Sequence, residues 1–242
     1  DMCIPYKNFI QALFLVRKSS FSLGIDFLMD YTLKSAFLLF LSKAKIRVGF
    51  DIASRGRLFH FGIRPSLEKK SLSAHTLDLV YEIARAFGIQ KNFSFNLVPK
   101  LFISEEAKSS ARKFFQEKGI DKSQLLVVIH PGSRYPSQRW MPERFAELAD
   151  IISKKYSAHI ILIGSIKDKA LILKITSFMK TNPILALGLD LDKISAIISF
   201  SHLFVGNNSG PLHIATALGI PTVSIMGPTD PFLWWPQGHN QI

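Results

Sequence analysis

Residues 203–226 read LFVGNNSGPLHIATALGIPTVSIM, in which an apolar run, a loop of small polar residues, a helix-like pattern and a second apolar run follow one another. The run Leu203–Val205 predicts a buried strand, and Ser209–Leu218 predicts a helix that ends at Gly219. A further strand is predicted at Thr222–Met226. Because two parallel strands need a crossover of this kind, the segment favours a β–α–β unit in a parallel sheet.

The same alternation runs through the chain from residue 125 onward. Short apolar runs predict three more strands, at Leu125–His130, His159–Ile163 and Ile184–Leu187. Helical spacing predicts helices that begin at Pro142, cover Asp168–Lys180 and cover Asp192–Phe200, the last with Asp192 as its N-cap. Strands that alternate with helices indicate an α/β fold, a Rossmann-like parallel sheet covered on both faces. In such sheets ligands bind at the carboxyl ends of the strands.

The first half of the chain contains fewer elements of the same kind. We predict strands at Gly24–Met29 and Ile46–Phe50, and helices at Thr32–Lys43 and His75–Phe87. A third helix, Ser104–Lys118, is expected to link the halves, with Ser104 as its N-cap. These fragments indicate an incomplete α/β domain.

The composition disfavours several classes of protein. The single cysteine, Cys3, allows no disulfide framework and no cysteine-based zinc site, and it favours a reducing compartment. No His/Asp/Glu cluster has the spacing of metal ligands, and no apolar run reaches the roughly 20 residues that cross a bilayer. The motifs Gly-x-x-x-x-Gly-Lys-Ser/Thr and Gly-x-Gly-x-x-Gly are absent, which argues against a P-loop ATPase and a standard dinucleotide dehydrogenase. The opening Asp1-Met2 suggests that the chain begins inside a longer protein.

The formal net charge of +12 lies mostly in the first 120 residues. A basic half of this kind favours an anionic partner, such as a phosphorylated glycolipid, a membrane surface or nucleic acid. A lysine-rich surface that serves solubility is an alternative that stays open. A nucleic-acid surface predicts aromatic residues between lysines and arginines on an exposed face, whereas the phenylalanines here follow core periodicity. We therefore expect no nucleic-acid partner.

The strongest candidate site is the loop that follows Leu203–Val205. Small residues let backbone N–H groups approach an anion there, and the helix N-terminus adds about half a unit of positive charge. Ser209 can cap the helix or hold a phosphate oxygen, and His213, one turn further on, can donate to a phosphate. A plain Asn-Ser-Gly turn with a hydrogen-bonded histidine is the structural alternative. The candidate binding residues are Asn207, Asn208, Ser209, Gly210 and His213.

A second candidate loop, residues 130–140, also lies between a strand and a helix. Arginine side chains in it can neutralise a diphosphate, and hydroxyl or amide groups can hydrogen-bond to it. The structural alternative is a basic surface loop with Trp140 packed beneath it. The candidate binding residues are Ser133, Arg134, Gln138 and Arg139.

Two further loops follow strands. Gly164 and Ser165 form a tight turn before Asp168, whose carboxylate can hold ribose hydroxyls, although a plain helix cap is the alternative. Gly227 and Thr229 belong to a loop after the last strand, where an ordinary Gly-Pro turn is the alternative. Because all four loops are expected at one edge of one parallel sheet, together they favour a site for a nucleotide diphosphate.

Two long stretches resemble glycosyltransferase family 9, the lipopolysaccharide heptosyltransferases. They are His130–Leu148, HPGSRYPSQRWMPERFAEL, and Val205–Pro228, VGNNSGPLHIATALGIPTVSIMGP. Ile25–Phe50 and His75–Gly88 resemble later parts of the family's N-terminal domain. The resemblance implies a GT-B fold of two Rossmann-like domains, of which the N-terminal one is incomplete here. It places an acceptor-side domain at residues 1–103, a linker helix at 104–122 and a donor domain at 123–242.

The resemblance also implies a reaction. It is the inverting, metal-independent transfer of a heptose-like sugar from an ADP-sugar to lipopolysaccharide core or a related glycolipid. The nucleotide-sugar is a substrate, so no cofactor is expected. We expect a cytoplasmic protein in peripheral contact with the inner face of the bacterial inner membrane.

Three departures from the family pattern bear on activity. The Gly-Asp loop that carries the presumed catalytic base has no counterpart in residues 1–24, so the base is expected upstream of this chain. Gln138 stands where the family often has lysine, and Asn208 where it often has aspartate. The chain also stops soon after Trp235-Pro236. A catalytically impaired remnant, or a binding module that keeps only the nucleotide-sugar pocket, is therefore the alternative to an active enzyme.

Overall fold

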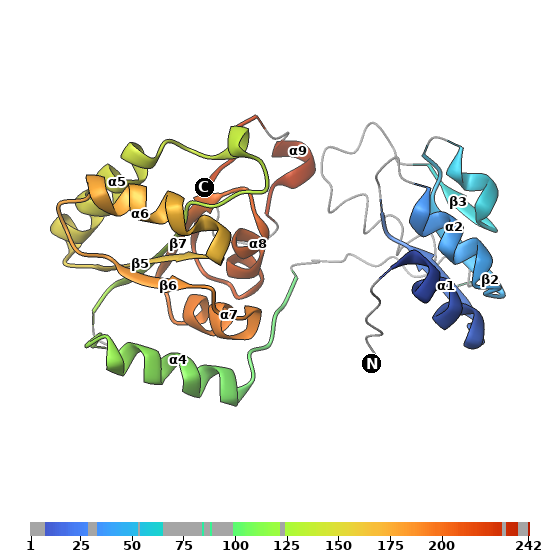
Figure 1. Ribbon diagram of the computed structural model, residues 1–242, viewed down its shortest axis with the longest axis horizontal. Coiled ribbons are helices and arrows are strands. Elements are labelled where there is room, and N and C mark those ends of the chain that lie inside the picture. The colour runs from blue at the N-terminus through green and yellow to red at the C-terminus, as the bar shows by residue number, and fades with distance from the viewer. Residues whose placement is uncertain are drawn as a thin grey trace. The chain divides into compact units, whose positions relative to one another are not determined.

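The computed structural model describes residues 8–28, 33–52, 54–64, 84, 88, 99–121, 124–228, 231–236 and 242. The chain divides into two compact units, Asp1–Phe95 and Asn96–Ile242 (Figure 1). Each unit contains a parallel sheet and helices, which confirms the α/β class predicted from the sequence.

The first unit is built on three parallel strands in the order β1-β2-β3. Its buried centre is formed by Val48 and Phe50 of the middle strand. Neither the first helix nor the third strand follows from the sequence patterns above. In chain order the described elements are α1 (Phe9–Lys18), β1 (Leu23–Asp26), α2 (Lys34–Leu41), β2 (Ile46–Phe50), the 3₁₀ helix η1 (Arg55–Leu58) and β3 (Phe61–Ile63).

A buried ion pair holds the carboxyl end of β1. Asp26 accepts hydrogen bonds from the guanidinium of Arg55 and from the hydroxyl of Ser35, the latter at 2.8 Å. Arg55 is fully buried, and it also donates to the carbonyl oxygen of Leu28 at 3.1 Å. A buried charge is tolerated only when it is paired in this way, so the pair fixes η1 against β1 and α2.

The second unit contains a five-stranded parallel sheet in the order β6-β5-β4-β7-β8. The order reverses direction between β4 and β7, which makes the sheet doubly wound and creates the position where such folds bind ligands. Its strands are β4 (Leu126–His130), β5 (His159–Gly164), β6 (Ile184–Leu187), β7 (Leu203–Asn207) and β8 (Thr222–Ile225). Its helices are α4 (Glu105–Glu117), η2 (Pro136–Gln138), α5 (Pro142–Tyr156), η3 (Ile166–Asp168), α6 (Lys169–Phe178), α7 (Leu191–Ser199), α8 (Gly210–Ala217) and α9 (Pro231–Trp234).

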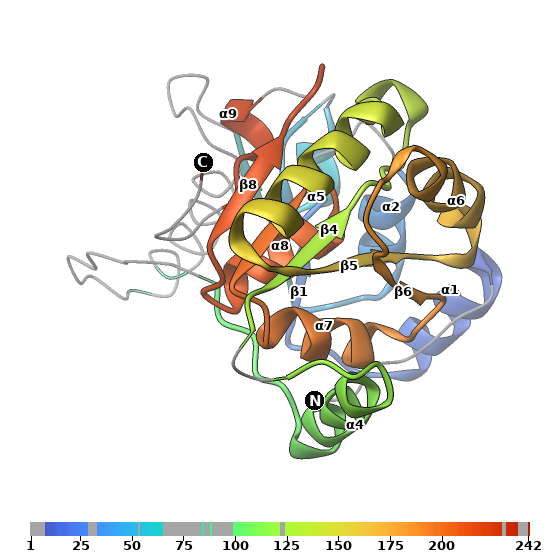
Figure 2. The ribbon, with the colours of Figure 1, turned by 90° about the vertical axis from the view of Figure 1, so that its left-hand side faces the viewer.

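Helices cover both faces of this sheet (Figure 2). Alternate residues of the central strand β4 point to opposite sides: Val127 and Ile129 pack with α5 and α6, whereas Leu126 and Val128 pack with α4, α7 and α8. All five β4 residues are buried. This two-sided burial explains why the strand reads as a continuous apolar run and shows no polar alternation.

The structure corrects several predicted boundaries. The helix expected at Asp192–Phe200 begins at Leu191, and its N-cap is Asp190, whose carboxylate accepts from the Lys193 backbone N–H at 2.9 Å. Asp192 is the second residue of the helix, where an acidic side chain is also favourable because of the helix dipole. The sequence pattern alone therefore does not show which of the two aspartates is the N-cap. Ser104 caps α4 as predicted, and that helix packs against α7 as part of the second unit.

Other predicted elements are shorter or fall outside the described residues. The first strand ends at Asp26, and the following helix runs from Lys34 to Leu41; Met29 and Thr32, which bounded the predictions, are outside the described residues. The helix predicted at His75–Phe87 also lies outside them, except for Ala84. No helix within the described ranges has both the length and the apolar character needed to cross a membrane.

Candidate functional site

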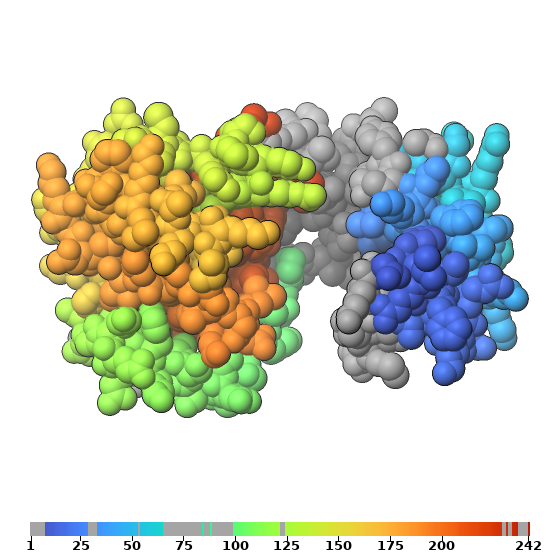
Figure 3. All heavy atoms as spheres, viewed as in Figure 1, coloured from blue at the N-terminus to red at the C-terminus, as the bar shows by residue number. Residues whose placement is uncertain are grey.

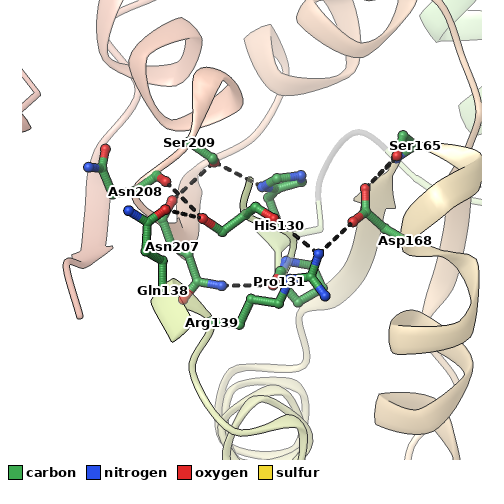
Figure 4. Close-up of polar contacts among 10 residues, drawn as sticks. His130, Pro131, Gln138, Arg139, Ser165, Asp168, Asn207, Asn208 and Ser209 are labelled. Carbon is green, nitrogen blue, oxygen red and sulfur yellow. Dashed lines mark hydrogen bonds and ion pairs between the residues drawn. The ribbon is translucent and has the colours of Figure 1, made fainter. Parts of the chain in front are cut away.

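The polar loops predicted from the sequence meet at the carboxyl ends of β4, β5 and β7 (Figure 4). Parallel pairing places the end of β4 beside β7, with His130 opposite Gly206. A Cβ atom at Gly206 would lie 2.9 Å from the carbonyl oxygen of His130, so this close approach requires glycine. The β8 loop reaches the same rim, because a Cβ at Gly227 would be 3.5 Å from the Cα of Gln138.

Asn207 joins the β4 loop to the end of β7. Its side chain is fully buried, donates to the carbonyl oxygen of Pro131 at 2.7 Å and accepts from the backbone N–H of Trp140 at 3.0 Å. Both polar groups of the amide are thereby occupied by protein partners. Asn207, predicted from the sequence as a binding residue, therefore acts in this structure as a clamp that fixes the two loops.

The β4 loop also carries polar groups that face the rim. The hydroxyl of buried Ser133 donates to Gln138 Oε1 at 2.9 Å and lies 3.5 Å from the carbonyl oxygen of Asn208. Arg139 donates from Nη2 to the carbonyl oxygen of Ser133 at 3.0 Å, and the same nitrogen is 4.0 Å from Asp168 Oδ1. The Nε atom of Arg139 is buried and has no acceptor within the part of the chain that the structure describes.

Ser209 occupies the N-cap position of α8, yet its hydroxyl does not cap the helix. The hydroxyl donates to the carbonyl oxygen of Asn207 at 3.0 Å and lies 3.0 Å from Nδ1 of His130. Among the described residues, the backbone N–H groups of Ser209 and Gly210 have no hydrogen-bond acceptor. A Cβ at Gly210 would meet no atom within 4 Å, so the N-terminus of α8 is open. Open N–H groups at a helix N-terminus form a binding position for an anion.

His130 is buried at the end of β4, with 7% of its surface exposed. Burial lowers the pKa of His130 from its ordinary 6.5 to about 4; Asp168 opposes that shift and Arg139 adds to it. The imidazole is therefore neutral near pH 7. The sequence did not single out His130 as a site residue, although its position between a buried strand and a Pro-Gly turn was a usable signal.

Asp168 and Ser165 form a capping box at the start of η3. Asp168 Oδ2 accepts from the backbone N–H of Ser165 at 3.0 Å and from its hydroxyl at 2.6 Å. The other oxygen, Oδ1, faces Gly132, where an added Cβ would lie 3.0 Å from it and 3.0 Å from His130 Nε2. The cap that the sequence offered as an alternative is present, and one carboxylate oxygen still faces the rim beside Arg139. Gly164 closes the turn, because a Cβ there would be 2.7 Å from Ile172.

Not every predicted residue joins this cluster. Arg134 is exposed, and its guanidinium lies over the ring of Tyr135 at 5.4 Å. His213 is partly buried on α8, and burial lowers its pKa. Trp140 packs edge-on against Phe145, as the structural alternative for that loop proposed. Thr229 lies outside the described residues. Within those residues, no group of three or more His, Cys, Asp or Glu side chains is arranged to hold a metal ion.

Two units with parallel sheets, the second doubly wound, place the chain in the GT-B fold class shared by its structural neighbours. Residues 15–242 match glycosyltransferase family 9 (heptosyltransferase), and the chain belongs to this family. The resemblance found in the two motif stretches is thereby confirmed.

Several proteins to which this chain is similar are heptosyltransferases. Lipopolysaccharide core heptosyltransferase OpsX of Haemophilus influenzae is 28% identical over 208 residues, which cover 84% of this chain and 56% of that protein. The structure of Escherichia coli ADP-heptose lipopolysaccharide heptosyltransferase II matches with a TM-score of 0.78 and 23% identity, over 97% of this chain and 71% of that one. The structure of E. coli heptosyltransferase WaaC with ADP matches with a TM-score of 0.67 and 17% identity, over 95% and 68%. At these identities the structural likeness establishes the fold, and the chain spans little more than half the length of the curated relative.

Proposed function

We propose that this chain provides the donor site of a heptosyltransferase. In this proposal a heptose-like sugar moves from an ADP-sugar to lipopolysaccharide core or a related glycolipid. The family and the named relatives support heptosyl transfer in lipopolysaccharide synthesis, and WaaC was solved with ADP. The observation that carries the proposal is the open N-terminus of α8 beside Arg139 at the carboxyl end of the sheet.

This rim offers positive charge at two points. The N-terminus of α8 presents the N–H groups of Ser209 and Gly210, and Arg139 presents a guanidinium whose Nε has no acceptor among the described residues. Gln138 and Asn208 add amides without charge. Because an unsatisfied buried donor costs about 1–3 kcal/mol, the free Nε favours a bound anion. A pyrophosphate satisfies both points at once.

We further propose that transfer inverts the anomeric centre and needs no metal. The oxygen of an acceptor hydroxyl attacks the anomeric carbon while the bond from that carbon to the β-phosphate oxygen breaks. ADP leaves with the bonding electrons, and α8 and Arg139 stabilise its developing charge. The acceptor proton passes to a general base that we do not assign among the residues of this chain. We propose that Asp168, through its Oδ1, contacts the ribose of the donor.

Calorimetric titration with ADP tests the donor site. Arg139→Ala removes a charge-assisted hydrogen bond worth about 1.5–3 kcal/mol, so we expect affinity to fall roughly 10- to 150-fold. Arg144→Ala is the matched control, because Arg144 is exposed on α5 and pairs only with Glu147 among the described residues. If the Arg139 variant bound ADP as tightly as the parent, the site would be misplaced.

A second assay separates the enzyme from a binding module. Transfer is followed with ADP-heptose and a lipopolysaccharide-core acceptor, with and without a chelator, and the anomeric configuration of the product is read by NMR. Unchanged turnover in the chelator and an inverted product support the mechanism. ADP binding without transfer supports the impaired remnant, which keeps only the nucleotide-sugar pocket.

The first unit suits an anionic glycolipid and the membrane surface that carries it. Helices α1 and α2 expose Ile10, Phe14 and Phe37, whose exposed fractions are 78%, 69% and 45%, and α1 is seen at the surface in Figure 3. Within residues 8–28 and 33–50 the one acidic side chain, Asp26, is buried with Arg55, so the exposed charge there is basic. Apolar rings beside basic residues favour the interface of an anionic bilayer.

We therefore propose a cytoplasmic protein in peripheral contact with the inner membrane. Co-sedimentation with phosphatidylglycerol vesicles tests it, with phosphatidylcholine vesicles for comparison. Ile10→Ser should weaken binding, whereas Ile151→Ser, at an exposed isoleucine of α5, should not. Equal sedimentation of both variants and the parent would argue against this surface.

A further inference from the structure

The carboxylate of Asp168 uses its two oxygens differently (Figure 4). Oδ2 accepts from the backbone N–H of Ser165 at 3.0 Å and from the hydroxyl of the same residue at 2.6 Å, which closes the capping box. Oδ1 accepts no hydrogen bond from the residues that the structure describes, and Nη2 of Arg139 lies 4.0 Å from it. The side chain is 13% exposed. Oδ1 is therefore a carboxylate oxygen that a ligand at the rim can still use.

Arg139 is the counterpart of this carboxylate. Its Nη2 donates to the carbonyl oxygen of Ser133 at 3.0 Å, and its buried Nε has no acceptor among the described residues. At 4.0 Å the ion pair with Asp168 is too long for a hydrogen bond, but it is short enough for the carboxylate to weaken the positive potential around the guanidinium. An anion at the rim therefore meets a cation whose charge is partly compensated.

The two groups favour different parts of one ligand. Arg139 and the open N–H groups of Ser209 and Gly210 favour a diphosphate. Oδ1 of Asp168 favours O–H donors and repels an anion. A nucleoside diphosphate brings the anion together with the hydroxyl groups of its ribose. Inorganic pyrophosphate brings the same anion without them.

We propose that Asp168 makes this site selective for a diphosphate that is joined to ribose: its carboxylate accepts from the ribose hydroxyls and disfavours the same anion when it arrives alone. This inference rests on the proposed donor site, and it adds a second role to the ribose contact proposed there. Selectivity of this kind uses a repulsive element as well as an attractive one. Only a ligand whose hydroxyl groups reach Oδ1 offsets the repulsion.

Calorimetric titrations of the full chain with ADP and with inorganic pyrophosphate test the proposal. Asp168→Asn keeps an oxygen for the Ser165 cap and removes the negative charge beside Arg139. We expect its pyrophosphate affinity to rise about tenfold and its ADP affinity to change by less than about threefold, because the lost repulsion and the weaker ribose contact oppose each other for ADP. Its preference for ADP over pyrophosphate should therefore fall.

Glu143→Gln is the matched control. It also removes one negative charge, from a half-exposed carboxylate on α5 that lies 3.8 Å from Lys174, and it should leave both affinities unchanged. If Asp168→Asn fails to fold, Asp168→Ser takes its place with the same expectation, because serine is favoured at the start of a helix.

A ligand that lacks only the ribose hydroxyls gives a second measurement. The 2′,3′-dideoxy form of ADP should bind the parent about tenfold more weakly than ADP does, and Asp168→Asn only about threefold more weakly. Unchanged pyrophosphate affinity in Asp168→Asn, or an equal rise in Glu143→Gln, would overturn the inference while ADP binding by the parent still supported the donor site. If the parent bound neither ADP nor pyrophosphate, the donor site would be refuted, and this inference with it.

Discussion

Replacement of Asn207 by alanine should lower the free energy of unfolding of the second unit by more than the loss of one hydrogen bond would. The side chain is fully buried and serves two backbone groups from one loop, the Pro131 carbonyl and the Trp140 N–H. A buried polar group left without a partner costs about 1–3 kcal/mol, and less where it is only part-buried, as at Trp140. We therefore expect Asn207→Ala to lower the free energy of unfolding by about 3 kcal/mol.

Urea denaturation followed by tryptophan fluorescence measures this effect on the second unit alone, because all three tryptophans of the chain, at positions 140, 234 and 235, belong to that unit. Asn208→Ala is the matched control: it removes the same amide one residue further on, where the side chain makes no hydrogen bond to the described residues. The control should change the free energy of unfolding by less than about 1 kcal/mol. Equal, small effects of the two substitutions would show that Asn207 is not the clamp inferred from its contacts.

Three further predictions follow from buried groups in the second unit. The pKa of His130 is about 4 in the folded chain, below its ordinary value of 6.5, so the unfolded chain binds a proton first as the pH falls. The free energy of unfolding should therefore be at its full value above about pH 6.5 and fall by about 3 kcal/mol toward pH 4. Urea denaturation at several pH values in this range should show a smaller fall in the free energy of unfolding for His130→Asn than for the parent. An equal fall in both would show that His130 is not the source of the pH dependence. Gly132→Ala forces a methyl group to within 3.0 Å of both the His130 ring and the Asp168 carboxylate, and should reduce ADP affinity in calorimetry by about tenfold. Asp150→Ala removes the carboxylate that accepts three hydrogen bonds from Lys180 and Thr181, at 2.6–2.9 Å, and should cost about 2–4 kcal/mol in the same urea assay; a loss below 1 kcal/mol would rule out a structural role.

Much of the second unit could be predicted because its strands are buried on both faces. Continuous apolar runs such as Leu126–His130 occur for that reason, and Gly219 marks the end of α8 with a positive φ of 76°. The first unit was harder to predict. The helix Phe9–Lys18 exposes several of its large apolar residues, so its pattern lacks a clear polar face, and the strand Phe61–Ile63 is too short to show any periodicity.

The candidate site, too, could be predicted from the sequence only in part. The sequence located the loops, because loops that follow parallel strands must meet at one edge of the sheet. The sequence did not show which residue of a loop has which role. Asn207 and Asn208 are adjacent amides, but Asn207 is buried and fixes two loops, whereas Asn208 lies at the rim. Arg134 and Arg139 were equal candidates until the path of the loop placed only Arg139 against Ser133 and Asp168.

The sequence by itself determined the α/β class, the alternation of strands and helices, and the two stretches that resemble the family, because each is encoded in local spacing along the chain. Only the tertiary structure brings the imidazole of His130 into contact with the hydroxyl of Ser209, at 3.0 Å. Those two residues are 79 positions apart and meet only when β4 and β7 pair. The partner of a buried polar group depends on all of its neighbours in space, and no local pattern in the sequence contains that information.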